Sequence, residues 1–360
     1  MSNAFSPLGS DEALTLVHEA TVHASKSSHI TVSSEAGRAI VATSASQRFV
    51  PWGESEPCAF AIGAFDGVHL GHRVLVDTCV RHARERGVLS AAILFDPDPA
   101  RVLAPASPEP ELLSVGDRAL LLLSLGLDAV VILRFDGGVA ATPYEEFVTR
   151  DLAAIAPIES IHVGNDFRLG AGGAGDVAHL GELGRASGFA VYGRDLVDHG
   201  GAPVTATRIR ALLASGDVRG ATELLGRCHV VHGTVAHGRG EGTGLGFPTA
   251  NVIPSPYACL PADGVYGCFV RMGECAWPAA VNVGRPRSFA MPAGSPERLL
   301  EANLIGFSQD IYGCGVEVVF VEWLRAPRTF PSISELERVV GDNVAWVREN
   351  LGTSRMEVGT

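Results

Sequence analysis

The chain has 360 residues, enough for two domains of ordinary size, and 46% of them are hydrophobic. Its 40 acidic and 28 basic residues give a formal net charge of −12, which disfavours nucleic acid or an anionic membrane as a partner. No apolar run approaches the roughly 20 residues that span a bilayer, and the first residues lack the basic and hydrophobic pattern of a secretory signal, so we expect a cytoplasmic protein.

Residues 1–50 are rich in serine and alanine without a sustained period, and we expect a mostly flexible extension there, with one short helix near 11–20. From about residue 57, apolar runs typical of buried strands alternate with helical stretches, the first of which covers 70–87. The strands of this half are expected at 58–63, 89–95, 128–135, 160–164 and 189–193. This alternation predicts a parallel sheet with helices on both faces, which binds ligands beyond the carboxyl ends of its strands.

Two short helices, expected at 207–215 and 218–225, end this half. After Gly226 the sequence turns to short strands separated by glycine and proline, which predicts an antiparallel barrel or sandwich. These strands are expected at 229–235, 264–272, 277–283, 299–305 and 316–324. A terminal amphipathic helix is expected at 332–351, with a serine or aspartate cap near its start and Gly352 after its end.

The chain contains seven cysteines, an odd number, and no two of them have CxxC spacing. This pattern indicates neither a disulfide framework nor a zinc site. We therefore expect unpaired thiols in a reducing compartment.

The first phosphate-binding signature is GAFDGVHLGH at residues 63–72. His69 and His72 are three residues apart at the expected start of a helix, so their side chains share one face, and Gly71 lets a phosphate approach the backbone. The helix N-terminus adds free N–H donors and partial positive charge. This arrangement suits a triphosphate that loses pyrophosphate. The alternative is a pair of unrelated histidines on a solvated helix start, and the preceding strand and FDGV sequence favour the site.

The second signature is GTVAHGRGEGTGLGFPTAN at residues 233–251. Glycines 238, 240, 242, 244 and 246 form a loop between two strands, where backbone N–H groups can converge on phosphate oxygens. The loop is not a Walker A motif, and a glycine-rich loop alone is more often a flexible turn. Thr249 and Asn251 change that balance, because their hard oxygen donors suit Mg²⁺ that carries nucleotide phosphates.

Both signatures resemble those of the bacterial bifunctional riboflavin kinase/FMN adenylyltransferases, also called FAD synthetases. In the first half, FDPDP (95–99), VGNDFRLG (163–170) and VTATRIR (204–210) resemble further elements of the nucleotidyltransferase half, in the same order. In the second half, the GxxxGxxLGFPTAN signature of riboflavin kinases is matched, and LLEANLIGF (299–307) followed by DIYG resembles the strand that bears their catalytic glutamate. The resemblance runs from about residue 57 to residue 350.

The resemblance implies an α/β protein: a Rossmann-like FMN adenylyltransferase domain at 51–226, after the extension at 1–50, and an antiparallel β-barrel riboflavin kinase domain with a terminal helix at 227–360. It implies two reactions, riboflavin and ATP to FMN and ADP, then FMN and ATP to FAD and pyrophosphate. The implied substrates are ATP, riboflavin and FMN, and the implied cofactor is Mg²⁺.

The resemblance also implies roles for individual residues. The implied catalytic residues are Glu301, His69, His72 and Arg210. The implied nucleotide-binding residues are Gly63, Phe65, Asp66, Gly67, Gly71, Thr205, Thr207, Gly238, Gly242, Gly246, Phe247, Pro248, Thr249 and Asn251. The implied flavin-binding residues are Asn165, Asp166 and Phe167, and the implied metal ligands are Thr249 and Asn251. Glu301 would accept the proton of the riboflavin 5′-hydroxyl during phosphoryl transfer.

The chain departs from the family pattern mainly in its first half. Asp98 stands where the family FxPHP element has histidine, Thr205 and Ala206 replace the two serines of SSTxIR, and the segment 171–176 lacks basic residues that relatives often carry. Each change removes a hydrogen-bond donor or a cation near a polyanion. Two alternatives therefore stay open: a paralogue with one working module, most plausibly the kinase, and a non-catalytic flavin- or nucleotide-binding protein.

Overall fold

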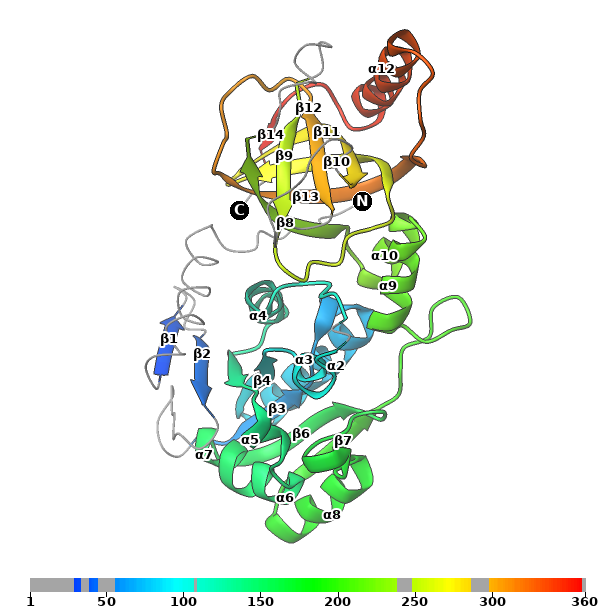
Figure 1. Ribbon diagram of the computed structural model, residues 1–360. Helices are drawn as coiled ribbons and strands as arrows, with labels where there is room; N and C mark the ends of the chain where they lie inside the picture. Colours follow the sequence, from blue (N-terminus) through cyan, green and yellow to red (C-terminus); the bar gives the residue numbers. More distant parts are fainter. Residues whose placement is uncertain are drawn as a thin grey trace. The chain divides into compact units, whose positions relative to one another are not determined.

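The computed structural model describes residues 29–33, 39–44, 56–106, 109–237, 248–285 and 298–357, and the chain divides into two compact units (Figure 1). Among the described residues, the first unit contains those up to 205 except 110–113, and we call it the sheet unit. The second contains 110–113 and the residues from 206 onward, and we call it the barrel unit. The domain boundary at residue 226 stays a prediction.

The sheet unit is built on a seven-stranded sheet in the order β1-β2-β5-β4-β3-β6-β7. Its strands are β1 (His29–Ser33), β2 (Ala39–Ser44), β3 (Cys58–Ile62), β4 (Leu89–Asp96), β5 (Ala129–Arg134), β6 (Ile158–Gly164) and β7 (Ala190–Arg194). Every neighbouring pair from β2 to β7 is parallel, and only β1 with β2 is antiparallel. The predicted parallel sheet is confirmed.

Side-chain alternation along the strands explains why both faces of this sheet are covered, since residues i and i+2 of a strand share a face. One face carries Phe60, Ile93 and Val131, which pack in one core with Phe147 and Leu180 from the helical segments beyond β5 and β6. The opposite face is covered by the helices that follow β3 and precede β5. The central strand β3 is therefore buried along its whole length.

The helical segments of the sheet unit vary in length. The longer ones are α2 (Leu70–Arg86), α4 (Val115–Ser124) and α8 (Val177–Ser187). The shorter ones are η1 (Asp66–Val68), α3 (Pro99–Leu103), α5 (Gly137–Ala140), α6 (Tyr144–Glu146), η2 (Phe147–Leu152), α7 (Ala153–Ile155) and η3 (Ala171–Gly173). The helix expected at 143–156 is thus replaced by short segments with a π-helical turn, η2, in the middle.

Strands β1 and β2 lie within residues 1–50, where the sequence indicates a mostly flexible extension. β2 pairs with β5 in parallel, and β1 pairs with β2. Their sequences, HITVS and AIVATS, contain β-branched residues that favour strands, but each run is too short for its period to be read from sequence alone. The short helix expected near 11–20 lies outside the described residues.

The barrel unit contains a closed antiparallel sheet. Its strands are β8 (His229–Ala236), β9 (Ala250–Pro254), β10 (Gly264–Met272), β11 (Cys275–Gly284), β12 (Leu299–Leu304), β13 (Gly315–Arg325) and β14 (Met356–Glu357). The strand order is β10-β13-β8-β9-β12-β11-β14, and an additional pairing of β10 with β11 closes the ring. The structure is therefore a barrel and not the sandwich that the sequence left open.

In the part of the barrel unit that the structure describes, the helices are α9 (Ala206–Ala214), α10 (Val218–Leu225) and α12 (Ile333–Asn350). The predicted serine cap of the terminal helix is present, because Ser332 Oγ accepts from Glu335 N–H at 3.2 Å. Val344 and Val347 of α12 pack with Ala280 and Ile305 in one buried cluster. No helix among the described residues is long and apolar enough to cross a membrane.

Candidate active sites

The first candidate site lies at the carboxyl ends of the central strands of the sheet unit (Figure 1). β3 lies between β4 and β6, and both pair with it in parallel. The strand order reverses between β3 and β6, which is the point at which open α/β sheets bind ligands. The loop after β3 carries the first signature, and the loop after β6 carries Asn165, Asp166 and Phe167.

The loop after β3 presents the two signature histidines together at the N-terminus of α2. His69 is the N-cap residue of α2, and its Nδ1 accepts from His72 N–H at 3.4 Å. The two imidazole rings are stacked with centroids 3.6 Å apart. Phe65 has a left-handed backbone with φ of 50° and sets the edge of its ring against His72. The side chains predicted to share a face are thus in contact.

Gly71 and Gly67 have clear reasons to be glycine. A Cβ on Gly71 would lie 3.1 Å from His69 Cε1, so a larger residue would press on the stacked ring. Gly67 has φ of 77°, which glycine adopts without strain. A Cβ on Gly63 would likewise lie 3.3 Å from Cε2 of the Phe65 ring. Asp66 is buried in the same loop.

The predicted flavin-binding loop is held by contacts between β6 and β7. Asn165 Nδ2 donates to Asp195 Oδ1 at 2.6 Å, and Asn165 N–H donates to Arg194 O at 2.8 Å. Asp166 is exposed and Phe167 is half-buried. Both follow the end of β6, the strand that neighbours β3. The structure therefore places this loop and the histidine loop at one edge of the sheet.

The predicted residues of the VTATRIR segment are divided between the two units. Thr205 belongs to the sheet unit, whereas Thr207 and Arg210 lie on α9 in the barrel unit. Arg210 Nε donates to Pro110 O at 2.8 Å, so this side chain contacts residues 110–113 of its own unit. The roles of Thr205, Thr207 and Arg210 at the first site stay predictions.

The second candidate site is a row of polar side chains across three neighbouring strands of the barrel. Glu301 on β12 lies directly opposite Asn251 on β9 and Asn282 on β11. Residues directly opposite one another point to the same face of a sheet. Asn282 Nδ2 donates to Glu301 Oε2 at 3.2 Å. Asn251 and Glu301, 50 residues apart in sequence, are thus neighbours on paired strands.

Part of the second signature lies outside the described residues, including Gly238, Gly242, Gly246 and Phe247. The described part begins with Pro248 and Thr249, both exposed, ahead of β9. Pro248 O accepts from Asn303 Nδ2 at 2.8 Å, which ties this end of the loop to β12 two residues beyond Glu301.

A pocket of about 610 Å³ opens beside this polar row, between the end of β12 and α12. Its lining residues are Pro248, Asn303, Leu304, Ile305, Gly306, Gly341, Val344, Ala345, Arg348 and Glu349. Asn303 and Glu301 are two residues apart on one strand, so their side chains share a face. A site of this size suits a small organic ligand, and its wall brings apolar groups together with a cation, a carboxylate and an amide.

Sequence reasoning missed Asn282, Asn303 and the pocket wall on α12. Asn282 stands in NVGRPRSF, which resembles the family only in part, and its importance arises from strand register with Glu301. Alternating polar residues on β12, Glu301 and Asn303, were a signal that the strand faces a polar site on one side.

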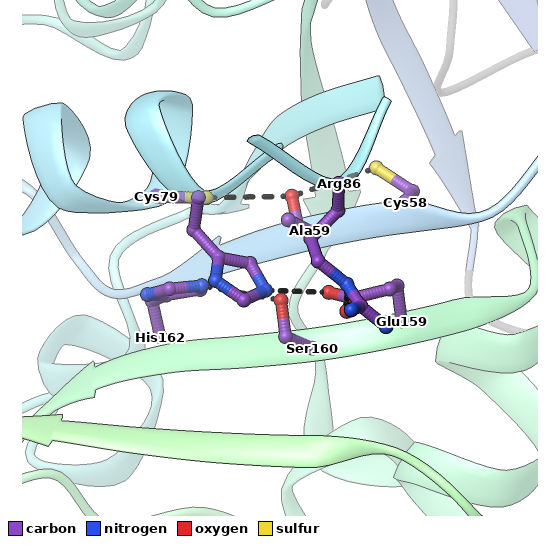
Figure 2. Close-up of polar contacts among 8 residues, drawn as sticks. Cys58, Ala59, Cys79, Arg86, Glu159, Ser160 and His162 are labelled. Carbon is purple, nitrogen blue, oxygen red and sulfur yellow. Dashed lines mark hydrogen bonds and ion pairs between the residues drawn. The ribbon is translucent and has the colours of Figure 1, made fainter. Parts of the chain in front are cut away.

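A separate polar cluster lies farther along α2, between this helix and strand β6 (Figure 2). Glu159 accepts from Arg86 Nε at 3.1 Å and pairs with His82 Nε2 at 2.9 Å. His162 is buried, contacts Ser160 Oγ at 3.2 Å and stacks on Tyr192 of β7. Within the described residues, no group of three or more His, Cys, Asp and Glu side chains could hold a metal ion.

The buried cysteines near this cluster are not activated nucleophiles. Cys58 and Cys79 both direct their sulfur atoms at Ala59 O, as Figure 2 shows. Burial raises the pKa of Cys79 to about 12 and also raises the pKa of Cys58. None of the seven cysteines takes part in a disulfide bond in the structure.

His162 should make the stability of the sheet unit depend on pH. Burial, with help from His82 and Arg194, lowers the pKa of His162 to about 4 from 6.5. The unfolded chain therefore takes up a proton at a higher pH than the folded chain. The stability contributed by neutral His162 is complete above about pH 6.5 and is lost as the pH falls towards 4. The total loss in the free energy of unfolding is on the order of 3 kcal/mol.

Urea unfolding at pH 7, 6 and 5 measures this effect. We expect His162→Phe, which keeps a ring against Tyr192, to reduce the loss of stability with falling pH. His179→Phe is the matched control, because His179 is an exposed histidine of the same unit. Equal pH dependence in the wild-type protein and His162→Phe would contradict the assignment.

Comparison with known proteins gives concordant matches along the chain. A family model described as FAD synthetase matches residues 53–208, and one described as riboflavin kinase matches residues 225–351. A bifunctional riboflavin kinase/FMN adenylyltransferase of Escherichia coli strain K12 is 32% identical over 83% of this chain and 95% of its own length. The relative with the same name in Pseudomonas fluorescens is 33% identical over 82% of this chain and 93% of its own length.

A solved structure shares the architecture of nearly the whole chain. It is described as a macrolide-efflux protein from Streptococcus pneumoniae, with a TM-score of 0.76 and 25% sequence identity over 86% of this chain and 98% of that chain. The efflux description belongs to that protein. The sequence relatives and both family models agree with one another on the two activities.

Proposed function

Because the chain belongs to the family of bacterial bifunctional riboflavin kinases/FMN adenylyltransferases, we propose which of its residues perform the two steps of FAD synthesis. The first step converts riboflavin and ATP to FMN and ADP, and the second converts FMN and ATP to FAD and pyrophosphate. The observation that carries the residue assignment is the register that aligns Asn251, Glu301 and Asn282 on one face of the barrel.

For the kinase step, we assign Glu301 as the general base. Its carboxylate accepts the proton of the riboflavin 5′-hydroxyl as that oxygen attacks the γ-phosphorus of ATP, and ADP leaves. The bond from Asn282 Nδ2 to Glu301 Oε2 fixes one carboxylate oxygen and leaves the other for the hydroxyl. Asn282 is therefore a positioning residue.

Thr249 and Asn251 fit a magnesium ion that arrives with ATP. Their hydroxyl and amide oxygens are hard donors, and magnesium bound to nucleotide phosphates needs few protein ligands. When bound, the ion neutralises phosphate charge. Asn251 lies beside Glu301 in register, so its amide stands next to the proposed base.

For the adenylyl step, we assign His69 and His72 to the phosphates of a second ATP. A phosphate oxygen of FMN attacks the α-phosphorus, the bond to the bridging oxygen breaks, and pyrophosphate leaves with added negative charge. The stacked histidines and the N-terminus of α2 supply donors where this charge develops. We keep Arg210 as the expected cation, and the neighbouring loop at Asn165 as the expected flavin contact.

We propose further that the location is cytoplasmic, and seven cysteines without a disulfide bond fit a reducing compartment. The division into domains at residues 50 and 226 is likewise proposed, and the matched ranges of the two family models support it.

Incubation with riboflavin, ATP and Mg²⁺, followed by chromatography of the flavins, tests the proposal. We expect FMN to form first and FAD to follow. FMN without FAD would indicate that only the kinase module works. If neither product formed while flavin fluorescence was still quenched on binding, the chain would be a non-catalytic binding protein.

We assign the pocket beside α12 to riboflavin, and Gly341 provides a test. A Cβ on Gly341 meets no atom within 4 Å, so a side chain there extends into the pocket without disturbing the helix. Gly341→Leu should raise the KM for riboflavin at least about tenfold, whereas the fold should be retained, because leucine favours helices by almost 1 kcal/mol over glycine.

Steady-state kinase rates measured against riboflavin concentration check this expectation. Glu337→Leu is the matched control, because Glu337 is exposed on the same helix and is not part of the pocket wall. An unchanged KM in Gly341→Leu would place riboflavin elsewhere.

A further inference from the structure

A buried arginine lies behind the histidine loop of the first site. Arg118, on α4, is 1% exposed. Its Nη1 donates to Ala64 O at 2.7 Å, and the same nitrogen lies 3.6 Å from Asp98 Oδ2. One guanidinium nitrogen therefore contacts both the first signature, which includes Ala64, and the aspartate that replaces the family histidine.

The bond to Ala64 bears directly on the geometry of the histidines. Ala64 immediately precedes Phe65, which has a left-handed backbone and whose ring packs edge-on against His72. A left-handed backbone at a bulky residue is costly and needs support from its surroundings. Arg118 supplies such support at the preceding carbonyl group, one residue from the turn.

The position of Asp98 is also fixed. Its Oδ1 accepts from Ala100 N–H at 3.0 Å as the N-cap of α3, and this bond leaves Oδ2 facing Arg118. The Asp98 side chain is 16% exposed, so its charge is only partly screened by water. Asp96 stands two residues earlier, at the carboxyl end of β4, where burial raises its pKa and Arg118 opposes that rise.

These carboxylates stand at the edge of the sheet where a triphosphate would bind. A carboxylate beside a polyanion is repulsive, and the repulsion is strong where water is scarce. A buried cation paired with that carboxylate removes most of the net charge. Breaking such a pair by removing one partner leaves an uncompensated charge.

We propose that Arg118 is a positioning residue for adenylyl transfer that also cancels the charge of Asp98. The inference rests on the proposed function of the sheet unit and assigns a role to a residue that belongs to neither signature. It also explains how the first site tolerates aspartate in place of histidine: the negative charge of Asp98 is compensated by a buried cation, which also binds the signature loop at Ala64 O.

The decisive measurement is a double-mutant cycle on Arg118 and Asp98, with FAD formation from supplied FMN and ATP as readout. We expect Arg118→Met to lower kcat/KM for ATP about a hundredfold, mainly through KM. Asp98→Asn alone should change it within about threefold. The double variant should recover about tenfold over Arg118→Met, because the unpaired carboxylate is then absent.

This recovery separates charge compensation from simple support of the fold. An arginine that only supported the loop at Ala64 would give no gain from Asp98→Asn. Arg84→Met is the matched control, because it removes an exposed positive charge from the same unit, and we expect its rate to stay near that of the wild-type protein. Thermal unfolding of each variant reports on folding of the chain, and the kinase rate reports on the barrel unit. If Arg118→Met is unstable, Arg118→Lys keeps a positive charge at the site.

The outcomes are distinct. No FAD from the wild-type protein would contradict the proposed function and this inference together. If the wild-type protein forms FAD, two results would overturn the inference alone. One is an Arg118→Met variant with the wild-type rate. The other is a double variant that is no faster than Arg118→Met.

Discussion

Glu301→Gln should lower the rate of riboflavin phosphorylation by about 10²–10⁴-fold, the usual contribution of a positioned general base. Glutamine has nearly the same shape and can still contact Asn282, but its amide cannot accept the hydroxyl proton. The expected loss is therefore in kcat, with little change in the KM for riboflavin or ATP. Initial rates of FMN formation at saturating substrate measure it.

The chain itself contains a control for this variant. Formation of FAD from supplied FMN is assigned to the histidine loop of the sheet unit and does not involve Glu301, so we expect Glu301→Gln to retain it. Glu274→Gln removes an exposed carboxylate from the turn between β10 and β11 and should leave both rates unchanged. Unchanged phosphorylation by Glu301→Gln would remove Glu301 from the role of base.

Asn282→Ala offers a weaker version of the same test. It removes the donor to Glu301 Oε2 but leaves the base in place, so its effect should be smaller than that of Glu301→Gln. Asn282 acts only by orienting Glu301, so its loss should lower the phosphorylation rate less than loss of the base itself.

Much of the fold could be predicted because its strands and helices carry local signals. β3 is a continuous apolar run. α2 begins after its N-cap residue, His69, and ends before Gly87, which has φ of 66°. The barrel strands β10 and β13 were similarly expected from their apolar content and flanking glycines. These elements need no knowledge of their partners.

The elements that were missed depend on their partners. β9 is only five residues long and begins inside the PTAN motif, which was interpreted as a loop end and metal site. β1 and β2 become recognisable as strands through pairing with β5 at the sheet edge. β14 has two residues and is defined by its pairing with β11.

The candidate sites show the same division. Residue type and spacing pointed to His69, His72 and Asn251, whereas Glu301 was identified through the resemblance to riboflavin kinases. The residues that orient them arise from register or from packing. Asn282 lies opposite Glu301 only once β11 and β12 are paired, and Arg118 reaches Ala64 across 54 positions of sequence.

His69→Asn should lower FAD formation from FMN and ATP by about 10²–10³-fold, the loss typical of removing a donor that stabilises charge in the transition state. Asparagine is a good N-cap residue, so its side-chain oxygen can replace His69 Nδ1 as the acceptor for His72 N–H, and α2 should keep its start. The imidazole that stacks on His72 is lost. Chromatography of FAD, with the kinase rate of the same protein as the internal control, measures the effect.

This substitution distinguishes two roles that coincide in one side chain. If His69 served mainly to cap α2, His69→Asn would keep adenylyl transfer and His69→Ala would lose it. If the ring acts on the phosphates, both variants lose the activity, and the asparagine variant does so without loss of thermal stability. The stack of His69 on His72, with centroids 3.6 Å apart, favours the second role, because capping alone requires no such contact between the rings. Retention of FAD formation in His69→Asn would leave His72 and the helix N-terminus as the groups that act on the nucleotide.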